Sequence, residues 1–208
     1  MLRPGKIVCV GRNYVAHAKE LGNVVPERPL IFLKPPSAVI GDGDPVVLPP
    51  ESKQVEHEAE IGVVLASPLR HAREEDALAA VAGITCVNDV TARDLQKTDK
   101  QWTRAKGFDT FCPVGPRVVP LADLPPLEEL EVIGRVNGTE RQRGRCADMA
   151  FGVPFLLAYI SSVMTLEAGD LVATGTPAGV GPLAAGDVVE VEIPGVGVLS
   201  NPVNEGPA

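Results

Sequence analysis

Three glutamates alternate along one short stretch of the chain, and their spacing points to chemistry with a cation. Glu56, Glu58 and Glu60 precede a continuous apolar run over residues 61–65. Alternate residues of a β-strand share a face, so a strand here would present the three carboxylates together. Carboxylates crowded in a poorly solvated site raise one another's pKa unless a cation such as Mg²⁺ or Mn²⁺ offsets them. The alternative is an edge strand whose acids all face water, and this segment alone supports both hypotheses equally.

A fourth acid, Asp89, follows residues 84–88, a run typical of a buried strand. A buried carboxylate needs a partner, so Asp89 favours the cation hypothesis. The competing explanation is that Asp89 caps a helix, because a polar run typical of a helix follows it. Thr91 and Asp94 have the spacing of a variant capping box, which predicts a helix starting at Thr91.

Short strands bounded by glycine and proline dominate the rest of the chain. Strands are predicted over residues 6–10, 30–33, 46–48, 58–66, 84–90, 130–136, 171–173, 187–193 and 197–199. Helices are predicted over residues 13–21, 74–81 (stopped by Gly83), from 91 onward and over 153–164. Asn137-Gly138 after the sixth strand is the strongest short hairpin signal. Because strands outnumber helices without alternating with them, we expect an α+β fold, mostly β, such as a β-roll.

Composition narrows the classes of partner. The chain has 208 residues with 19 basic and 27 acidic side chains, a net charge of −8 that argues against nucleic-acid or membrane binding. The 21 glycines and 20 prolines punctuate apolar runs, as in a turn-rich β protein.

The longest apolar stretch, 153–160, is too short to span a bilayer, and the start of the chain has no signal-peptide pattern. The four cysteines form no C-x-x-C pair and suit a buried core, so we expect a soluble cytoplasmic protein.

Three common enzyme motifs do not fit. Residues 179–184 match a loose G-x-G-x-x-A, but Pro182 opposes the helix that a dinucleotide site needs there. The sequence contains neither a G-x-S-x-G nucleophile elbow nor an H-E-x-x-H zinc motif.

Six short sequence motifs, referred to below as strings, lie between residues 6 and 199 in the same order as in the fumarylacetoacetate hydrolase family. The chain therefore resembles that family, in particular its short acylpyruvase-like and oxaloacetate-decarboxylase-like members. The strings are Gly11-Arg12-Asn13-Tyr14 with His17 and Glu20; Phe32-Leu33-Lys34-Pro35; His57-Glu58-Ala59-Glu60; Asn88-Asp89-Val90-Thr91-Ala92-Arg93-Asp94-Leu95-Gln96; Ala105-Lys106-Gly107-Phe108; and Thr174-Gly175-Thr176-Pro177 with Gly179-Val180-Gly181. The resemblance implies a mixed β-roll of the family's C-terminal type. It also implies one catalytic domain over 1–208, without the extra N-terminal domain of larger members, and a homodimer.

The resemblance further implies a Mg²⁺ or Mn²⁺ site formed by Glu58, Glu60 and Asp89, whereas Glu56 matches no ligand position. Three protein ligands leave open positions for substrate and water. In the family, an α-keto acid chelates the metal, which stabilises the enolate that forms when a C–C bond breaks.

Four further residues of the matching strings gain roles in binding a small anionic keto acid. Lys106 would add positive charge beside the developing anion, the alternative being a solvated surface lysine. Arg93 and Gln96 lie three apart on one helical face and would reach the same pocket, unless they form a surface pair. Thr176, in a glycine-proline turn after a strand, offers a hydroxyl for a substrate carboxylate.

His17 and Glu20 are neighbours on the short helix predicted over 13–21. A carboxylate orients the imidazole and raises its basicity, so the pair would activate water. Alone, such a pair is more often a surface contact, but its place in the family string favours the catalytic role. The glycines and polar residues nearby, within residues 1–25, suit a lid over the active site.

The leading hypothesis is a Mg²⁺- or Mn²⁺-dependent hydrolase that cleaves a C–C bond in small 2,4-diketo acids such as acetylpyruvate or fumarylpyruvate. Decarboxylation of oxaloacetate passes through the same enolate and is a plausible second activity. The nearest rival is an isomerase or tautomerase of hydroxymuconate-type or oxaloacetate-type acids. A non-catalytic metal or keto-acid binder is a further alternative, which has no use for His17, Glu20 and Lys106.

Overall fold

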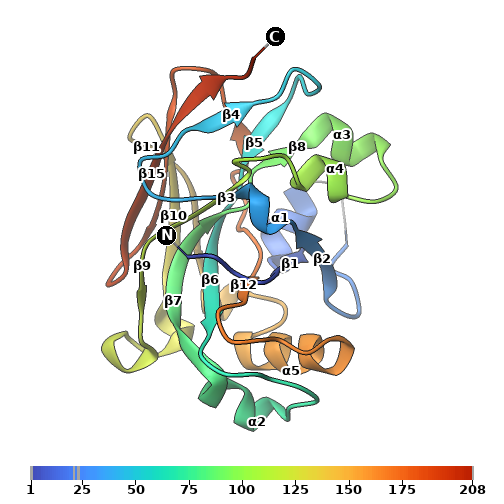
Figure 1. The fold of residues 1–208 in the computed structure, drawn as a ribbon, viewed down its shortest axis with the longest axis vertical. Helices are drawn as coiled ribbons and strands as arrows, with labels where there is room; N and C mark the ends of the chain where they lie inside the picture. The colour runs from blue at the N-terminus through green and yellow to red at the C-terminus, as the bar shows by residue number, and fades with distance from the viewer. Residues whose placement is uncertain (1, 21, 23, 208) are drawn as a thin grey trace.

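Two β-sheets packed face to face form the body of the molecule, as seen in the computed structural model, which describes residues 2–20, 22 and 24–207 (Figure 1). The larger sheet has seven strands, in the spatial order β2 (Leu30–Lys34), β1 (Ile7–Gly11), β12 (Leu171–Ala173), β6 (Ala59–Leu65), β7 (Val81–Asn88), β9 (Cys112–Val119) and β3 (Val39–Ile40). It is a mixed sheet, because β1 pairs in parallel with β12, and β3 with β9, while its other pairs are antiparallel.

The second sheet has five strands, in the order β11 (Thr139–Arg145), β10 (Glu131–Val136), β14 (Val188–Ile193), β15 (Gly197–Glu205) and β4 (Val46–Leu48). A small third sheet joins β13 (Gly181–Pro182), β5 (Val55–His57) and β8 (Thr91–Ala92). This mostly-β, mixed architecture confirms the fold class predicted from the sequence.

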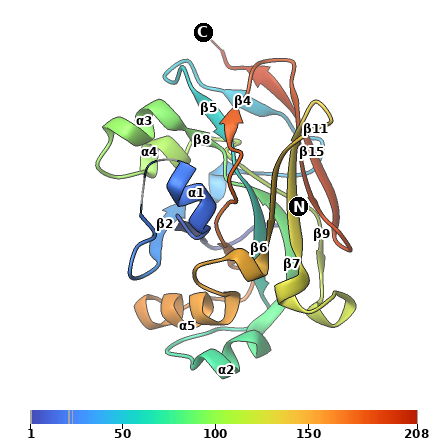
Figure 2. The same ribbon diagram turned by 180° about the vertical axis from the view of Figure 1, so that it is seen from behind.

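In the described residues, five short helices flank the sheets: α1 (Val15–Glu20), α2 (Glu74–Ala77), α3 (Arg93–Thr98), α4 (Thr103–Lys106) and α5 (Val153–Val163). Single 3₁₀ turns occupy Pro36–Ala38, Leu78–Ala80, Leu121–Asp123, Leu127–Glu129 and Cys146–Asp148. In both ribbon views, α2 and α5 lie together at one end of the molecule, and α3 and α4 lie together away from them (Figures 1 and 2). None of the helices in the described part of the chain is long and apolar enough to cross a membrane.

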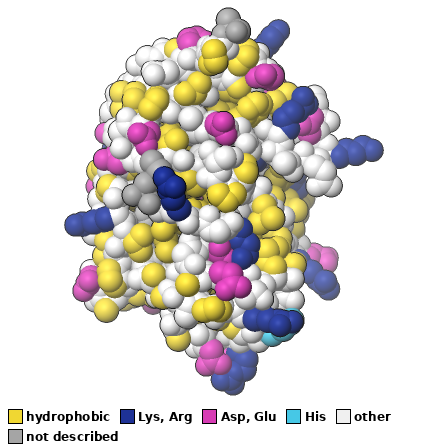
Figure 3. Space-filling model, in the orientation of Figure 1, with side chains coloured by type: hydrophobic (Ala, Val, Ile, Leu, Met, Phe, Trp, Pro, Cys, Tyr) yellow, Lys and Arg dark blue, Asp and Glu magenta, His cyan; other side chains and the backbone are white. Residues whose placement is uncertain are grey.

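The main core lies between the two large sheets and under α5. Ile61 and Val63 of β6 meet Val191 of β14 there, and α5 adds Leu156 and Ile160. Each such side chain contributes about 1.5–3 kcal/mol by leaving water. On the face of Figure 3, basic and acidic side chains are interspersed among apolar ones.

The central strands of the seven-stranded sheet are buried on both faces, which explains their continuous apolar sequences. In β1, Val8 and Val10 face the main core, whereas Ile7 and Cys9 belong to a second apolar cluster on the opposite face. Strands covered on both faces lose the alternation of polar and apolar residues. All four cysteines are buried and free of disulfides, in agreement with their predicted place in the core.

Several predicted element ends differ from the structure. The helix at Glu74 ends at Ala77, and Gly83 does not stop it but lies inside β7. A Cβ atom at Gly83 would lie 2.3 Å from the carbonyl oxygen of Val119, so the glycine permits close approach of β9. Strand β15 continues to Glu205, because its pairing with β14 and then β4 extends well past its apolar start.

The predicted capping box at Thr91 is wrong. Thr91 belongs to β8 and pairs with Glu56, and its hydroxyl donates to the carbonyl of Asp89. Helix α3 begins at Arg93, and Asp94 instead accepts hydrogen bonds from residues 52, 53 and 95. The hairpin prediction is confirmed, because Asn137 and Gly138 take φ angles of 51° and 73° between β10 and β11.

Candidate metal centre and active site

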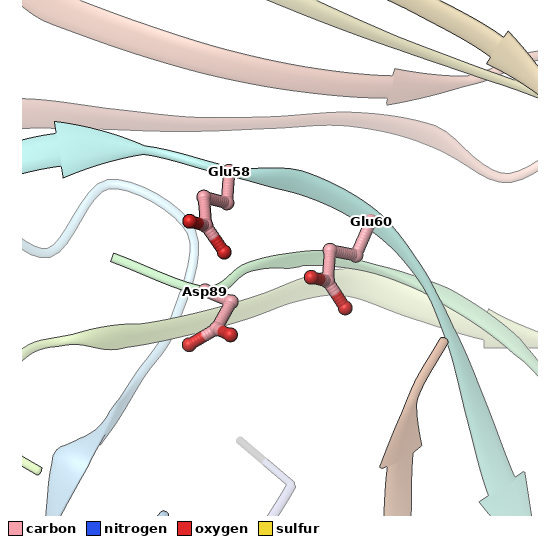
Figure 4. A group of neighbouring side chains, drawn as sticks. All are labelled: Glu58, Glu60 and Asp89. Atoms are coloured by element: carbon pink, nitrogen blue, oxygen red, sulfur yellow. The ribbon is translucent and has the colours of Figure 1, made fainter. Parts of the chain in front are cut away.

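The carboxylates of Glu58, Glu60 and Asp89 converge at one buried point (Figure 4). One ligand oxygen from each lies within 4.8 Å of the others. The antiparallel pairing of β6 with β7 brings them together, because Ala59 lies opposite Asn88. The backbone N–H of Asp89 also donates to the carbonyl of Glu58 at 2.9 Å. The structure therefore places the three predicted ligands side by side, although they come from two separate stretches of the chain.

Glu56 lies outside this cluster, as the sequence analysis expected. The strand is interrupted at Glu58, so Glu56 belongs to β5 in the third sheet and Glu60 to β6 in the first. The carboxylate of Glu56 accepts from Gln54 at 2.6 Å and from Arg93 at 2.7 Å. Its role is to hold the arginine that in turn contacts Glu58.

Two buried lysines neutralise part of the cluster. Lys106, only 2% exposed, donates to Glu58 at 2.7 Å and to Asp89 at 2.6 Å. Lys34 donates to the other oxygen of Asp89 at 2.6 Å. Asp89 is thus an ion-pair partner and not a helix cap, and Lys106 is not a solvated surface lysine. Burial alone would lower the pKa of Lys106, but Asp89 and Glu58 outweigh burial and raise it, so the ammonium stays charged.

Arg93 is also buried, which excludes the alternative of a surface pair with Gln96. Its guanidinium donates to Glu58 at 2.6 Å, to Glu56 at 2.7 Å and to Gln96 at 2.6 Å. Burial would raise the pKa of Glu58, but Lys106 and Arg93 outweigh it and hold the pKa well below its ordinary value. Glu58 is therefore ionised at neutral pH, as a ligand for a cation would need to be.

Glu60 differs from the other two acids because it forms no ion pair with any residue in the described ranges. Its carboxylate accepts one hydrogen bond, at 2.8 Å from the backbone N–H of Gly175. Burial, with the charges of Asp89 and Glu58, raises its pKa well above the ordinary value. A buried acid that lacks a cation, beside two ionised acids, fits a site built for a hard divalent ion with oxygen ligands. The residues present therefore suit Mg²⁺ or Mn²⁺.

His17 and Glu20 sit together at the edge of the same site. The Nδ1 atom of His17 lies 3.2 Å from the Glu20 carboxylate, and His17 is 4% exposed, which is not a surface contact. The other carboxylate oxygen of Glu20 accepts from the backbone N–H of Gly179 at 2.9 Å. This bond ties α1 to the loop that follows β12. Of the lid predicted within residues 1–25, positions 1, 21 and 23 lie outside the described residues.

A single cavity of about 50 Å³ joins these groups. All nine predicted site residues except Glu20 line it: His17, Glu58, Glu60, Asp89, Arg93, Gln96, Lys106 and Thr176, together with Val10, Gly11, Arg12, Phe32 and Trp102. Glu20 belongs to the site through its bond to His17. The volume suits a small molecule, since one water needs about 10–15 Å³ on this scale.

Thr176 lines the cavity from the loop after β12. Its hydroxyl donates to the carbonyl of Ala59 at 2.9 Å and accepts from Gln142 at 2.7 Å. Gln142 and Lys34 contact residues of the candidate site, and the sequence reasoning assigned a role to neither of them. The signal for Lys34 was present, because it ends an apolar strand within one of the matching strings. Gln142 stands among exposed charged residues of β11 and gave no comparable signal.

A conserved-domain profile described as "Fumarylacetoacetate (FAA) hydrolase C-terminal" matches residues 6–204. The mixed β-roll with its buried carboxylate cluster is thus the domain of that family, and this chain belongs to the fumarylacetoacetate hydrolase family.

Named relatives of the chain share most of its length. A mitochondrial oxaloacetate tautomerase of Arabidopsis thaliana is 45% identical over 195 residues, covering 92% of this chain and 87% of the relative. A mitochondrial oxaloacetate decarboxylase of Dictyostelium discoideum is 44% identical over 196 residues, covering 92% and 89%. The crystal structure of a 5-carboxymethyl-2-hydroxymuconate delta-isomerase from Mycobacterium smegmatis superposes with a TM-score of 0.92 at 44% identity, covering 100% of this chain and 81% of the other.

Proposed function

We propose that the protein is a Mg²⁺- or Mn²⁺-dependent enzyme that interconverts the keto and enol forms of a small 2-keto diacid of the oxaloacetate type. The observation that supports it most is the shared cavity, where three clustered carboxylates face an imidazole-carboxylate pair and a charged lysine. The names of the relatives, which include an oxaloacetate tautomerase and a muconate-type isomerase, agree with this choice of reaction.

Glu58, Glu60 and Asp89 would hold the cation. When bound, the cation supplies positive charge that stabilises the charge developing on the oxygens of the keto acid. Lys106 uses two of its ammonium hydrogens on Glu58 and Asp89. The third hydrogen remains for a substrate oxygen, since an ammonium has three donors.

His17 would move the proton. Its Nδ1–H donates to the Glu20 carboxylate, which leaves the lone pair on Nε2 as the base. In the keto-to-enol direction, Nε2 takes a proton from the carbon beside the keto group. The C–H electron pair becomes the new C=C bond and the C=O π electrons move onto the keto oxygen. That oxygen takes a proton from water to become the enol hydroxyl, and the imidazolium of His17 returns its proton to water. The reverse sequence regenerates the keto acid.

Arg12 is the group that would bind the second carboxylate of a diacid. It lines the cavity, and it forms no ion pair with any residue that the structure describes. Its backbone takes a φ of 59°, an unusual value for a residue other than glycine and one often found at functional sites. Asn13 anchors this turn, because its side chain donates to the carbonyl of Thr174 at 2.8 Å.

Hydrolysis of acylpyruvates is the second candidate, and the His17–Glu20 pair favours it. In that reaction Nε2 takes a proton from water, the hydroxide adds to the acyl carbonyl, and the C–C bond breaks. The bonding electrons pass to the pyruvate part, which leaves as its enolate and takes the proton back from the imidazolium of His17, while the acyl part leaves as a carboxylic acid. Decarboxylation of oxaloacetate needs no activated water, so it is compatible with the same residues.

A substrate panel tests the proposal. Oxaloacetate, acetylpyruvate, fumarylpyruvate and a hydroxymuconate isomerase substrate are each assayed with Mg²⁺ and again with EDTA. We expect fast equilibration of keto and enol oxaloacetate that EDTA abolishes. Turnover of acetylpyruvate at a higher kcat/KM would favour the hydrolase instead, and turnover unaffected by EDTA would contradict the metal site.

A further inference from the structure

Two aromatic side chains meet at the candidate site from separate parts of the chain. The rings of Phe32, in β2, and Trp102, just before α4, lie edge to face, with centroids 5.2 Å apart and planes at 76°. Helix α4 packs beside β2, which brings the two segments together (Figure 1). Both residues line the candidate cavity. Phe32 and Trp102 therefore form an aromatic wall of that cavity.

The aromatic wall also lines a second, larger space. A surface hollow of about 540 Å³ lies beside β2 and α4, and apolar residues such as Ile31, Leu33 and Pro35 contribute to it. Among the residues that the structure describes, Phe32 and Trp102 are the two that line both spaces. The wall thus separates a small polar cavity from a larger hollow with apolar sides.

Several contacts hold the two rings in place. The Lys106 ammonium lies over the Phe32 ring, 5.0 Å from its centroid, where the ring face attracts a cation. A Cβ atom at Gly11 would lie 2.9 Å from a ring carbon of Trp102, so the glycine lets the indole lie against β1. The carbonyl of Trp102 accepts from the backbone N–H of Lys106 at 2.9 Å, which ties the residue to α4. The wall is therefore a supported part of the site.

The aromatic wall stands beside the group proposed to bind the second carboxylate of a diacid. Gly11, against which Trp102 packs, directly precedes Arg12, which also lines the cavity. The cavity volume of about 50 Å³ has room for about four water-sized groups. A short 2-keto acid is of this size, whereas a chain that continues past Arg12 meets the rings.

We propose that Phe32 and Trp102 are specificity-determining residues that close the cavity and restrict the substrate to short 2-keto acids, with chains no longer than that of oxaloacetate. Removing a ring joins the cavity to the surface hollow, which then accepts a longer apolar chain. This inference rests on the proposed function, because it assumes that a 2-keto acid binds in the cavity.

Straight-chain 2-keto monoacids are the probes, because they share the carboxylate and keto group and differ only in length. Calorimetric titration of pyruvate and of 2-oxohexanoate into Mg²⁺-loaded protein measures their affinities. We expect the wild type to bind 2-oxohexanoate about tenfold or more weakly than pyruvate, since forcing extra methylenes against packed side chains is unfavourable.

Trp102→Ala removes most of the wall and should abolish this preference for the short acid. Each methylene that moves from water into the hollow adds about fourfold in affinity, so 2-oxohexanoate should gain about tenfold or more relative to pyruvate. Pyruvate binding itself should change less than about twofold, because the contacts at its carboxylate and keto group remain. Trp102→Leu should shift the ratio in the same direction by a smaller factor, and it replaces Trp102→Ala if that variant does not fold.

Leu33 allows a test of where the longer chain lies, because it lines the hollow and not the cavity. Leu33→Ser alone should change neither affinity. Combined with Trp102→Ala, it should lower the affinity for 2-oxohexanoate about fourfold and leave pyruvate unchanged, since the chain loses apolar contact. Gln101→Ala, at an exposed position next to Trp102, is the matched control and should change neither affinity.

Two failures are distinguishable. Absence of pyruvate binding to the wild type in Mg²⁺ would overturn the proposed function, and this inference with it. Pyruvate binding together with the same ratio of the two affinities in the wild type and in the Trp102 variants would overturn the inference alone.

Discussion

The ammonium group of Lys106 lies 2.6 Å from a carboxylate oxygen of Asp89, and both side chains are almost completely withdrawn from solvent. The same ammonium contacts Glu58, so one lysine bridges two of the three proposed metal ligands. A fixed positive charge beside a cation site limits how tightly the cation binds. The same charge on Lys106 can also stabilise an anion that forms beside the cation.

This arrangement predicts that Lys106→Met affects Mg²⁺ binding and turnover differently. Removing the charge leaves the cluster more negative, so Mg²⁺ should bind at least as tightly as in the wild type. Turnover should fall by about 10²-fold, the usual effect of losing one donor to a developing oxyanion. Thermal-shift titration with Mg²⁺ and steady-state kinetics measure the two effects. Lys100→Met, at an exposed position, is the control, and a parallel loss of metal affinity and turnover would argue against the assigned role.

Glu60→Gln should stabilise the metal-free protein, because it removes a buried acid that lacks a cation partner. The pKa of Glu60 in the folded protein lies well above its ordinary value of 4.5. As pH rises from that value, the unfolded chain loses this proton first, so the folded wild type loses stability. The advantage of Glu60→Gln should therefore grow between pH 5 and 8 in urea unfolding with EDTA. Saturating Mg²⁺ should stabilise the wild type and not the variant, and an advantage that is flat with pH would refute the assignment.

His17→Ala should lower the rate of keto-enol exchange about 10²- to 10⁴-fold, the range for loss of a general base. Glu20→Gln should have a smaller effect, because the imidazole remains but loses its partner. Decarboxylation of oxaloacetate, measured as CO₂ release on the same samples, should be much less affected. His71→Ala, at an exposed position, is the control. If CO₂ release and keto-enol exchange fall together, His17 has a broader role than proton transfer at carbon.

Arg12→Gln should change selectivity between substrates. Loss of a carboxylate contact should raise KM for oxaloacetate about tenfold, the effect of losing one charged hydrogen bond, and leave KM for acetylpyruvate nearly unchanged. Arg28→Gln, at an exposed position, is the matched control. An equal change in both KM values would mean that Arg12 does not contact the distal carboxylate.

The local sequence and the family resemblance together predicted the candidate ligands better than the elements that position them. Alternation at Glu56, Glu58 and Glu60 left a cation site and a solvated edge strand equally supported, and the resemblance then selected Glu58, Glu60 and Asp89. The break at Glu58 was not predictable, because it depends on β5 pairing with β8 and β13 while β6 pairs with β7.

The residues that hold the site together were harder to predict. Lys34 and Gln142 contact Asp89 and Thr176, which lie 55 and 34 positions away along the chain, and no local pattern encodes such contacts. The capping box at Thr91 failed for a related reason. The local signal for a helix start competed with strand pairing to Glu56, and the pairing prevailed.

The binding of oxalate tests the central claim most directly, because oxalate chelates a divalent cation and undergoes no reaction. Calorimetric titrations would compare protein in Mg²⁺, protein in EDTA, and the Asp89→Asn variant in Mg²⁺. The proposed site predicts binding to the wild type in Mg²⁺ alone, with at least a tenfold loss in EDTA and in Asp89→Asn, as expected when a ligand depends on a metal. Equal binding with and without Mg²⁺ would contradict the proposal that Glu58, Glu60 and Asp89 hold the cation on which substrate binding depends.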